Sequence, residues 1–179
     1  MLKELIQKID SDFSDSKEFL EQNYKVSERN NLEVLQTKVS ILTLGTYVEN
    51  RTYEIIQEFL NSHKDSLLYE FLENHALNRK FHTMFDFRSN NLNKFFGLFG
   101  DEFCDFMKTK TKIDEDFKNS ISAFLEICVK RNTLAHENFY LTSIDLTLEE
   151  VYKKAENIEL FYQKFQVYSA EFQTKNTSA

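Results

Sequence analysis

One short stretch of this chain contains both kinds of side chain that metal-free cleavage of RNA requires. Arg131 and His136 lie five positions apart in the run Arg-Asn-Thr-Leu-Ala-His. Arginine stays charged and offers parallel donors to a phosphate, whereas histidine gains or loses a proton near pH 7. A pair of this kind can bind a phosphate and move a proton at the same place.

The spacing of the two residues constrains how such a site is built. In a regular helix, five residues correspond to a rotation of about 140° and a rise of about 7.5 Å. A straight helix would therefore not direct both side chains at one phosphate. The spacing favours a site at a bend near Thr133, or at a seam where two protomers face each other across a two-fold axis.

The composition predicts a single, all-helical domain. The 179 residues include no proline and only three glycines, which suits long helices joined by polar turns. Phenylalanine occurs 18 times, enough for a bulky aromatic core. Hydrophobic residues make up 41% and charged residues 28%, the balance of a globular domain. We assign residues 1–172 to this domain and residues 173–179 to a flexible tail.

Hydrophobic periodicity and capping residues predict the positions of the helices. The first segment is expected as two short helices, 2–10 and 16–24, or as one helix broken at Asp12–Asp15. A long helix over about 27–62 contains Gly45, which indicates close approach of a neighbouring helix. Further helices are expected at 66–74, 92–99 and 101–108, and Gly100 would end the second of these. Another is expected from Asp114 to the Arg131 motif. The last is expected from Thr147, which forms a capping box with Glu150, to about residue 172.

The charge distribution argues against a surface that coats nucleic acid generally. The net charge is −7, which opposes a broadly cationic surface. Two segments are nevertheless locally basic, and each is either a solvated face or part of a groove for RNA phosphates. The first, residues 79–94, has Arg79, Lys80, Arg88 and Lys94, and the second, residues 108–112, has Lys108, Lys110 and Lys112.

Residue spacing does not indicate a metal or cofactor site. Cys104 and Cys128 lie far apart and are typical of reduced core thiols. His63, His75 and His82 have no carboxylate at zinc-ligand spacing. No signal peptide and no apolar run of about 20 residues is evident, so we expect a cytoplasmic protein that does not enter a membrane.

The run from Arg131 to His136 resembles the Arg-x4-6-His motif of the HEPN superfamily, small helical proteins that include many prokaryotic toxin and phage-defence ribonucleases. Asn132 is the residue commonest after the arginine in that family. The motif also falls where the family has it, at the end of a core helix and before the last helix. The run Leu44–Asn50, with an aromatic residue and the acid Glu49, is similar to the long early helix of HEPN proteins. The resemblance covers about residues 30–172.

This resemblance implies an all-α, HEPN-like helical bundle with a long early helix and extra short helices. It also implies metal-independent endoribonuclease activity that leaves a 2′,3′-cyclic phosphate. His136 would be general base toward a ribose 2′-hydroxyl or general acid toward the leaving 5′-oxygen, and Arg131 would stabilise the phosphorane. Asn132 would orient the histidine or hold a bend, and Glu49 is a candidate acid to orient His136.

The resemblance has consequences for partners too. It implies an RNA substrate, a homodimer with a composite active site, and an inhibitor or antitoxin that restrains a toxin or defence effector. HEPN toxins controlled by an adenylylating partner carry a tyrosine two residues after the histidine. Asn138 occupies that position here and the nearest tyrosine is Tyr140, so we do not expect that mode of control.

An alternative interpretation needs no catalysis. Arg131 would cap carbonyl groups at the end of its helix, Asn132 would end the helix in a left-handed conformation, and His136 would be a loop residue bonded to the backbone. The chain would then be a non-catalytic HEPN module for dimerisation and for binding protein or RNA. The negative net charge agrees with this alternative.

Overall fold

The computed structural model describes residues 2–60 and 81–177. These ranges contain helices and no strand, which confirms the all-α class. Within the described part of the chain, no helix combines the length and the apolar character that a membrane span requires. The helices are α1 (Leu2–Gln22), α2 (Val26–Leu60), α4 (Phe81–Met84), α5 (Asn93–Gly97), α6 (Asp101–Ile113), α7 (Glu115–His136) and α8 (Leu148–Thr177).

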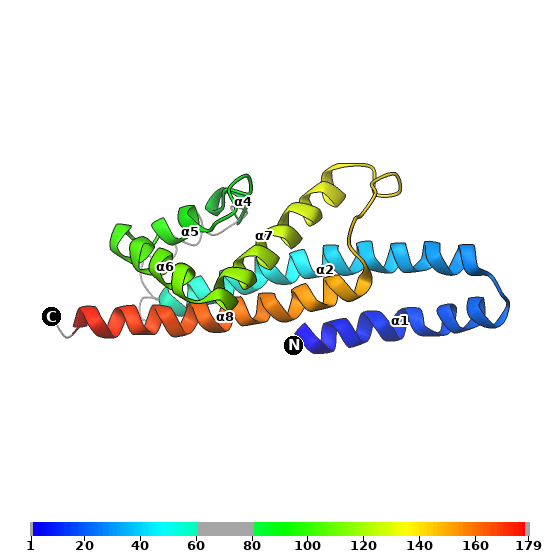
Figure 1. The fold of residues 1–179 in the computed structure, drawn as a ribbon, viewed down its shortest axis with the longest axis horizontal. Coiled ribbons are helices and arrows are strands. Elements are labelled where there is room, and N and C mark those ends of the chain that lie inside the picture. Colours follow the sequence, from blue (N-terminus) through cyan, green and yellow to red (C-terminus); the bar gives the residue numbers. More distant parts are fainter. Residues whose placement is uncertain (1, 61–80, 178–179) are drawn as a thin grey trace.

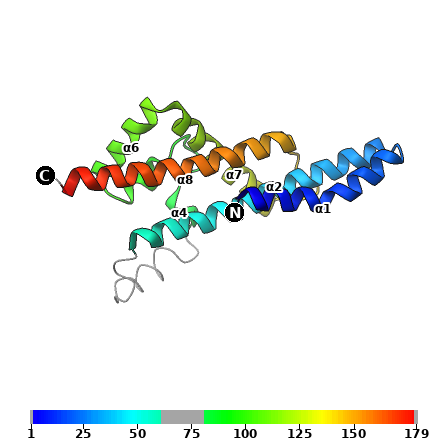
Figure 2. The same ribbon diagram turned by 90° about the horizontal axis from the view of Figure 1, so that it is seen from below.

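The long helix α2 is the element around which the others are arranged. α1 runs back along the first half of α2, whereas α7 and α8 pack against each other and against α2 (Figure 1). α5 and α6 form a small group that packs onto this bundle near the C-terminal end of α8 (Figures 1 and 2). The last turn of α7, which carries the Arg131 motif, lies at the opposite end of α7 from α6.

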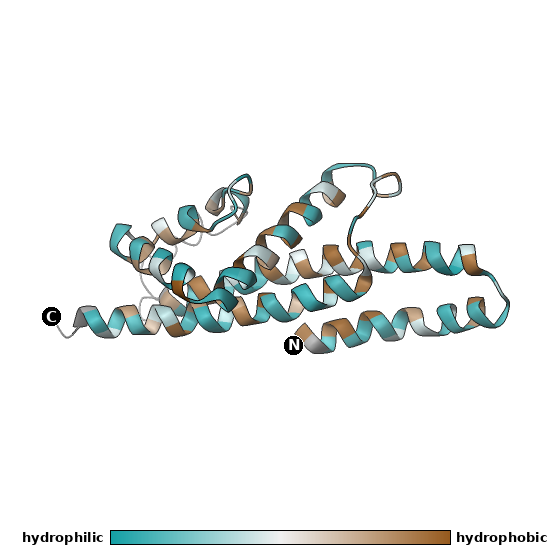
Figure 3. Cartoon of the chain, viewed as in Figure 1, coloured by the Kyte–Doolittle hydropathy of each residue, from teal (hydrophilic) through white to brown (hydrophobic). Residues whose placement is uncertain are grey.

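Aromatic rings fill the centre of the bundle. Phe117 and Phe124 of α7 meet Phe161 of α8 at ring-centroid distances of 6.0 and 4.9 Å. Phe165 extends this cluster to Phe96 of α5, at 6.1 Å. Figure 3 shows the resulting pattern, in which hydrophobic and hydrophilic residues alternate along the helices. The apolar face expected for α7 is buried throughout: Phe117, Ile121, Phe124, Leu125 and Cys128.

The first helix is continuous, so the expectation of a break at Asp12–Asp15 was wrong. The polar side chains there bond along the helix and do not interrupt it. Lys8 Nζ lies 2.6 Å from an Asp12 carboxylate oxygen, and Ser14 Oγ donates to the carbonyl of Ser11. These local pairs stabilise the helical backbone where capping was expected.

Two helix boundaries near the middle of the chain also differ from expectation. α6 continues to Ile113, well past the expected end near residue 108. Gly100 follows α5 by a short turn and directly precedes α6, whose Cys104 N–H donates to the Gly100 carbonyl. Its φ of 106° lies in the region that favours glycine, so this residue joins the two helices as well as ending the first.

The last helix begins as expected and ends later. The N–H of Glu150 donates to Thr147 Oγ1, and the N–H of Thr147 donates to the Glu150 carboxylate, which confirms the capping box. The helix continues to Thr177, so most of the segment expected as a tail after residue 172 is helical. The helix expected at 66–74 lies outside the described residues.

Candidate functional site

Arg131 is placed by a glycine on the neighbouring helix. Its side chain crosses α2 at Gly45, where an added Cβ would lie 2.3 Å from Arg131 Cγ and 2.8 Å from Arg131 Cβ. No residue with a side chain fits there unless α7 or the arginine moves. The close approach of a neighbouring helix that Gly45 predicted is therefore confirmed, and α7 is that helix.

Past Gly45, the guanidinium of Arg131 meets three different polar groups. Nη2 lies 3.4 Å from a carboxylate oxygen of Glu49, one helical turn along α2 from Gly45. Nη1 lies 3.3 Å from Asn132 Oδ1 and 3.3 Å from His82 Nε2. Arg131 thus connects α2, α4 and α7 and does not serve as a cap for helix-end carbonyls.

These contacts hold the guanidinium loosely. Charge-assisted N–H···O bonds are usually about 2.7–2.9 Å long, and all three contacts of Arg131 are longer. The side chain remains 23% exposed, and that of Glu49 remains 26% exposed. A cation held in this way keeps its position but can still donate to an incoming anion.

His136 is the last residue of α7, and its side chain is exposed. The helix runs without interruption from Glu115 through Thr133 to His136, and the N–H of Glu137 donates to the Thr133 carbonyl. The helix therefore shows no break near Thr133. Asn132 is helical as well, since Tyr24 is the only non-glycine residue with positive φ in the described ranges, so the left-handed alternative for Asn132 was wrong.

The structure assigns Glu49 a partner that differs from the expected one. Sequence comparison with the HEPN pattern suggested that this acid orients His136, whereas its carboxylate pairs with Arg131. The negative charge of Glu49 also favours the protonated form of His82 and so opposes the lowering of its pKa. In the structure the Glu49 carboxylate contacts the guanidinium and offsets its positive charge.

His82 is the member of this cluster that sequence reasoning missed. It lies on α4, and its ring contacts Phe81 and Phe87 at centroid distances of 5.5 and 6.1 Å. Burial lowers the pKa of His82, and the nearby charges of Arg131 and His136 lower it further. Residue spacing offered no signal for this contact, because His82 belongs to a four-residue helix and is 49 positions from Arg131.

The segment after His136 is tied to α2 by a buried lysine. Lys38 is only 5% exposed and donates from Nζ to the carbonyl of Phe139 at 2.7 Å. Asn138 Oδ1 accepts the N–H groups of Tyr140 and Leu141 and so builds the turn itself. The position next to the motif at which some HEPN toxins have a tyrosine is therefore occupied by a turn-forming residue.

The basic segment 108–112 is not part of the cluster around Arg131. In α6, Lys108 pairs with Asp105 at 2.8 Å and Lys110 pairs with Glu171 at 2.6 Å. α6, the helix that carries both lysines, lies at the other end of α7 from the motif (Figure 1). These pairs argue against a groove for RNA phosphates at residues 108–112, although Lys110, at 17% exposed, is packed against the protein and not solvated. In the basic segment 79–94, Arg79 and Lys80 lie outside the described residues.

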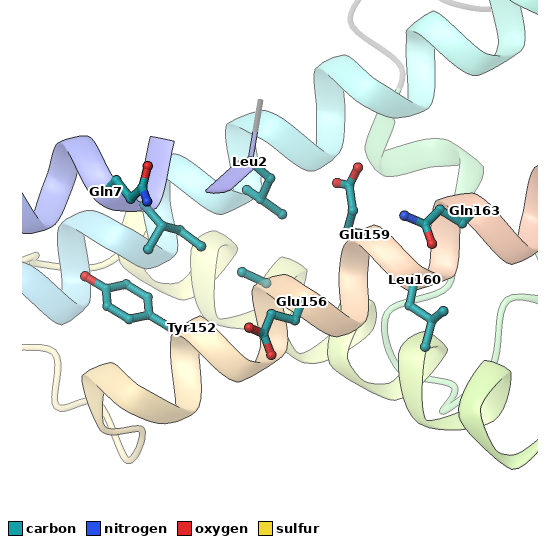
Figure 4. A pocket seen from close by; sticks show the side chains of 9 residues that line it. Leu2, Gln7, Tyr152, Glu156, Glu159, Leu160 and Gln163 are labelled. Atoms are coloured by element: carbon teal, nitrogen blue, oxygen red, sulfur yellow. The ribbon is translucent and has the colours of Figure 1, made fainter. Parts of the chain in front are cut away.

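A hollow elsewhere in the molecule does not suit a phosphate. It lies between α1 and α8 and is lined by Leu2, Ile6, Glu156 and Glu159 among others (Figure 4). Its two carboxylates would repel an anion. Among residues 2–60 and 81–177, no group of three or more histidine, cysteine or acidic side chains is arranged to hold a metal ion. The cluster around Arg131 is therefore the best candidate site in the described chain.

Comparison with known proteins agrees with the motif. Residues 3–168 match a family model described as RiboL-PSP-HEPN. No curated protein and no solved structure gives a significant match. The matched range includes α2, α4, α5, α6 and α7 in full, most of α1 and α8, and the residues Glu49, His82, Arg131, Asn132 and His136.

Proposed function

The chain belongs to the RiboL-PSP-HEPN family, and on that premise we propose that it is a metal-independent endoribonuclease of the HEPN type. HEPN domains are often ribonucleases, and this one retains the arginine and the histidine of their motif. The observation that carries the proposal is the placement of Arg131. Its guanidinium is partly exposed, loosely bonded, and within 3.3 Å of an imidazole nitrogen.

The three motif residues and Glu49 each have a role in this reaction. Arg131 binds the scissile phosphate and stabilises the charge that develops on the phosphorane. His136 acts as general base on the 2′-hydroxyl or as general acid toward the 5′-oxygen. Asn132 and Glu49 hold the guanidinium. The products are a 2′,3′-cyclic phosphate and a 5′-hydroxyl.

The cellular role that fits such an enzyme is that of a toxin or phage-defence effector, restrained by an inhibitor protein. We expect a homodimer, because the 140° between Arg131 and His136 on an uninterrupted helix suits a site shared by two protomers. Measurement of the mass in solution tests the dimer against the monomer mass of 21.3 kDa. A strict monomer would remove the shared-site mechanism.

A second function is favoured by one specific observation. The Glu49 carboxylate faces Arg131 and offsets its charge, and the chain as a whole carries a net charge of −7. A weakly charged motif suits a non-catalytic HEPN module that dimerises and binds protein or RNA. The two functions make opposite predictions for RNA turnover.

The experiment that separates them is cleavage of labelled total RNA and tRNA in EDTA. Wild type, Arg131→Ala and His136→Ala are compared at equal concentration. Cleavage by wild type alone, with 2′,3′-cyclic phosphate ends, is the expected result. Intact RNA with all three proteins would favour the binding module. Expression in a bacterial host gives a second readout, because wild type should slow growth and His136→Ala should not.

A further inference from the structure

Cleavage of RNA without a metal requires two proton transfers. One proton leaves the attacking 2′-hydroxyl, and one proton reaches the departing 5′-oxygen. The Arg131–His136 motif contains a single imidazole. A protomer that cleaves RNA by itself therefore needs a second group, unless its partner supplies one.

The structure holds a second imidazole beside the arginine. His82 Nε2 lies 3.3 Å from Arg131 Nη1. The ring is positioned by Phe81, which is 3% exposed, and by Phe87. Despite these contacts the residue as a whole is exposed, so a substrate bound to Arg131 can reach it.

The contact with Arg131 determines which nitrogen of His82 is basic. A guanidinium only donates hydrogen bonds, so a bond to Nε2 uses the lone pair of that nitrogen and leaves the proton on Nδ1. The lone pair is thus directed at the guanidinium, and the contact is long, so a phosphate that draws Arg131 away from His82 frees Nε2 to accept a proton. Burial and the charges of Arg131 and His136 lower the pKa of His82, with Glu49 opposing, so the ring is neutral near pH 7.

From this geometry we infer that His82 is the general base of the reaction and that His136 is its general acid, an inference that rests on the proposed ribonuclease function. His82 Nε2 takes the proton of the 2′-hydroxyl while the 2′-oxygen forms a bond to phosphorus. The bond from phosphorus to the 5′-oxygen breaks, and that oxygen takes a proton from the His136 imidazolium. Arg131 holds the phosphate, and because Arg131 and His136 lie about 140° apart on the uninterrupted α7, the acid comes from the second protomer of the expected homodimer.

A positioning role for His82 is the competing explanation, because its lone pair also accepts from Arg131. Glutamine separates the two roles. His82→Gln retains a side-chain acceptor for the guanidinium but cannot transfer a proton at neutral pH. If His82 only positions Arg131, His82→Gln keeps most of the activity that His82→Ala loses.

The assignment of base and acid is tested with a modified RNA. In this substrate a sulfur atom replaces the bridging 5′-oxygen at the cleaved linkage. A thiolate departs without protonation, so loss of the general acid matters little, whereas loss of the general base still matters. We measure kcat/KM for wild type, His82→Gln, His82→Ala and His136→Gln on both RNAs in EDTA, after circular dichroism has shown that each variant is folded.

We expect His82→Gln to lower kcat/KM by about 10²–10⁴-fold on both substrates. His136→Gln should show a loss of that size only with the oxygen substrate. Activity of His82→Gln within about threefold of wild type would overturn the inference and leave the proposed function standing. Rescue of His82→Gln by sulfur would also overturn it, because His82 would then be the acid. Intact RNA with wild type would refute the proposed function, and this inference with it.

Discussion

Gly45 and Arg131 are in direct contact across the α2–α7 interface, and the contact involves the base of the arginine side chain. An added Cβ on residue 45 would lie 2.8 Å from Arg131 Cβ and 2.3 Å from Cγ. The Cβ atom moves only with the α7 backbone. The glycine therefore determines both how closely the two helices pack and where the guanidinium emerges.

Gly45→Ala should destabilise the fold in spite of the better helix propensity of alanine. Alanine contributes about 1 kcal/mol of propensity, but overpacking of this kind costs about 1–3 kcal/mol. We expect a lower unfolding midpoint in urea and weaker RNA cleavage. Gly97→Ala is the matched control, because a Cβ there meets nothing within 4 Å. Equal stability of the two alanine variants would mean that the contact is absent in solution.

The pKa of His82 should respond in opposite directions to two substitutions. Arg131 lowers this pKa and Glu49 raises it. Arg131→Ala should therefore raise the pKa of His82, and Glu49→Gln should lower it. An NMR titration of the imidazole Cε1–H resonances measures both shifts, with the His82 signal assigned from its loss in His82→Gln. Shifts of the same sign in the two variants would show that the cluster is arranged differently.

Asp114 should make the fold sensitive to strong acid. Burial alone would raise its pKa, but hydrogen bonds from Lys164 Nζ, the Tyr168 hydroxyl and the Phe117 N–H lower the pKa to about 2. Because the folded pKa is below the unfolded value of 3.8, the stabilisation is present above about pH 4 and is lost as the pH falls toward 2. The side chain is 18% exposed and solvent screens part of the interaction, so the shift corresponds to at most about 2 kcal/mol.

Urea unfolding between pH 2 and pH 7 measures how much the ionised Asp114 side chain stabilises the fold. Asp114→Asn retains a helix-capping side chain but loses the charge, so it should flatten the dependence on pH below 4. Asp116→Asn is the control, since that carboxylate is 77% exposed and lies 3.8 Å from the same lysine. An Asp114→Asn curve parallel to that of wild type would exclude the ion pair as the cause.

Tyr24→Gly should stabilise the turn between α1 and α2. Tyr24 has φ of 55°, and its N–H and that of Lys25 donate to the carbonyls of Glu21 and Leu20, the pattern of a glycine-type helix end. A residue with Cβ costs about 1–2 kcal/mol in this conformation, and the exposed ring loses little when removed. We expect a gain of about 1 kcal/mol by urea unfolding. Tyr24→Ala retains Cβ, so a comparable gain in that variant would contradict the explanation.

Local patterns predicted most of the helices and the motif. The apolar face of α7 and the capping box of Thr147 and Glu150 could be read from neighbouring residues, and Gly45 indicated a close helix without identifying which one. Such features depend on contacts within one or two helical turns or on the size of one side chain. The same reasoning was wrong at Asp12–Asp15, where polar residues bond along a helix, and at the ends of α6 and α8.

The sequence by itself therefore determined the all-α class and the pair Arg131 and His136 as candidate chemistry. Only the tertiary structure decided that Glu49 pairs with Arg131 and that His82 joins them. The physical reason is that these contacts depend on how α2, α4 and α7 pack. A helix repeat specifies which residues share a face, whereas the partner of that face depends on packing between segments far apart in the chain.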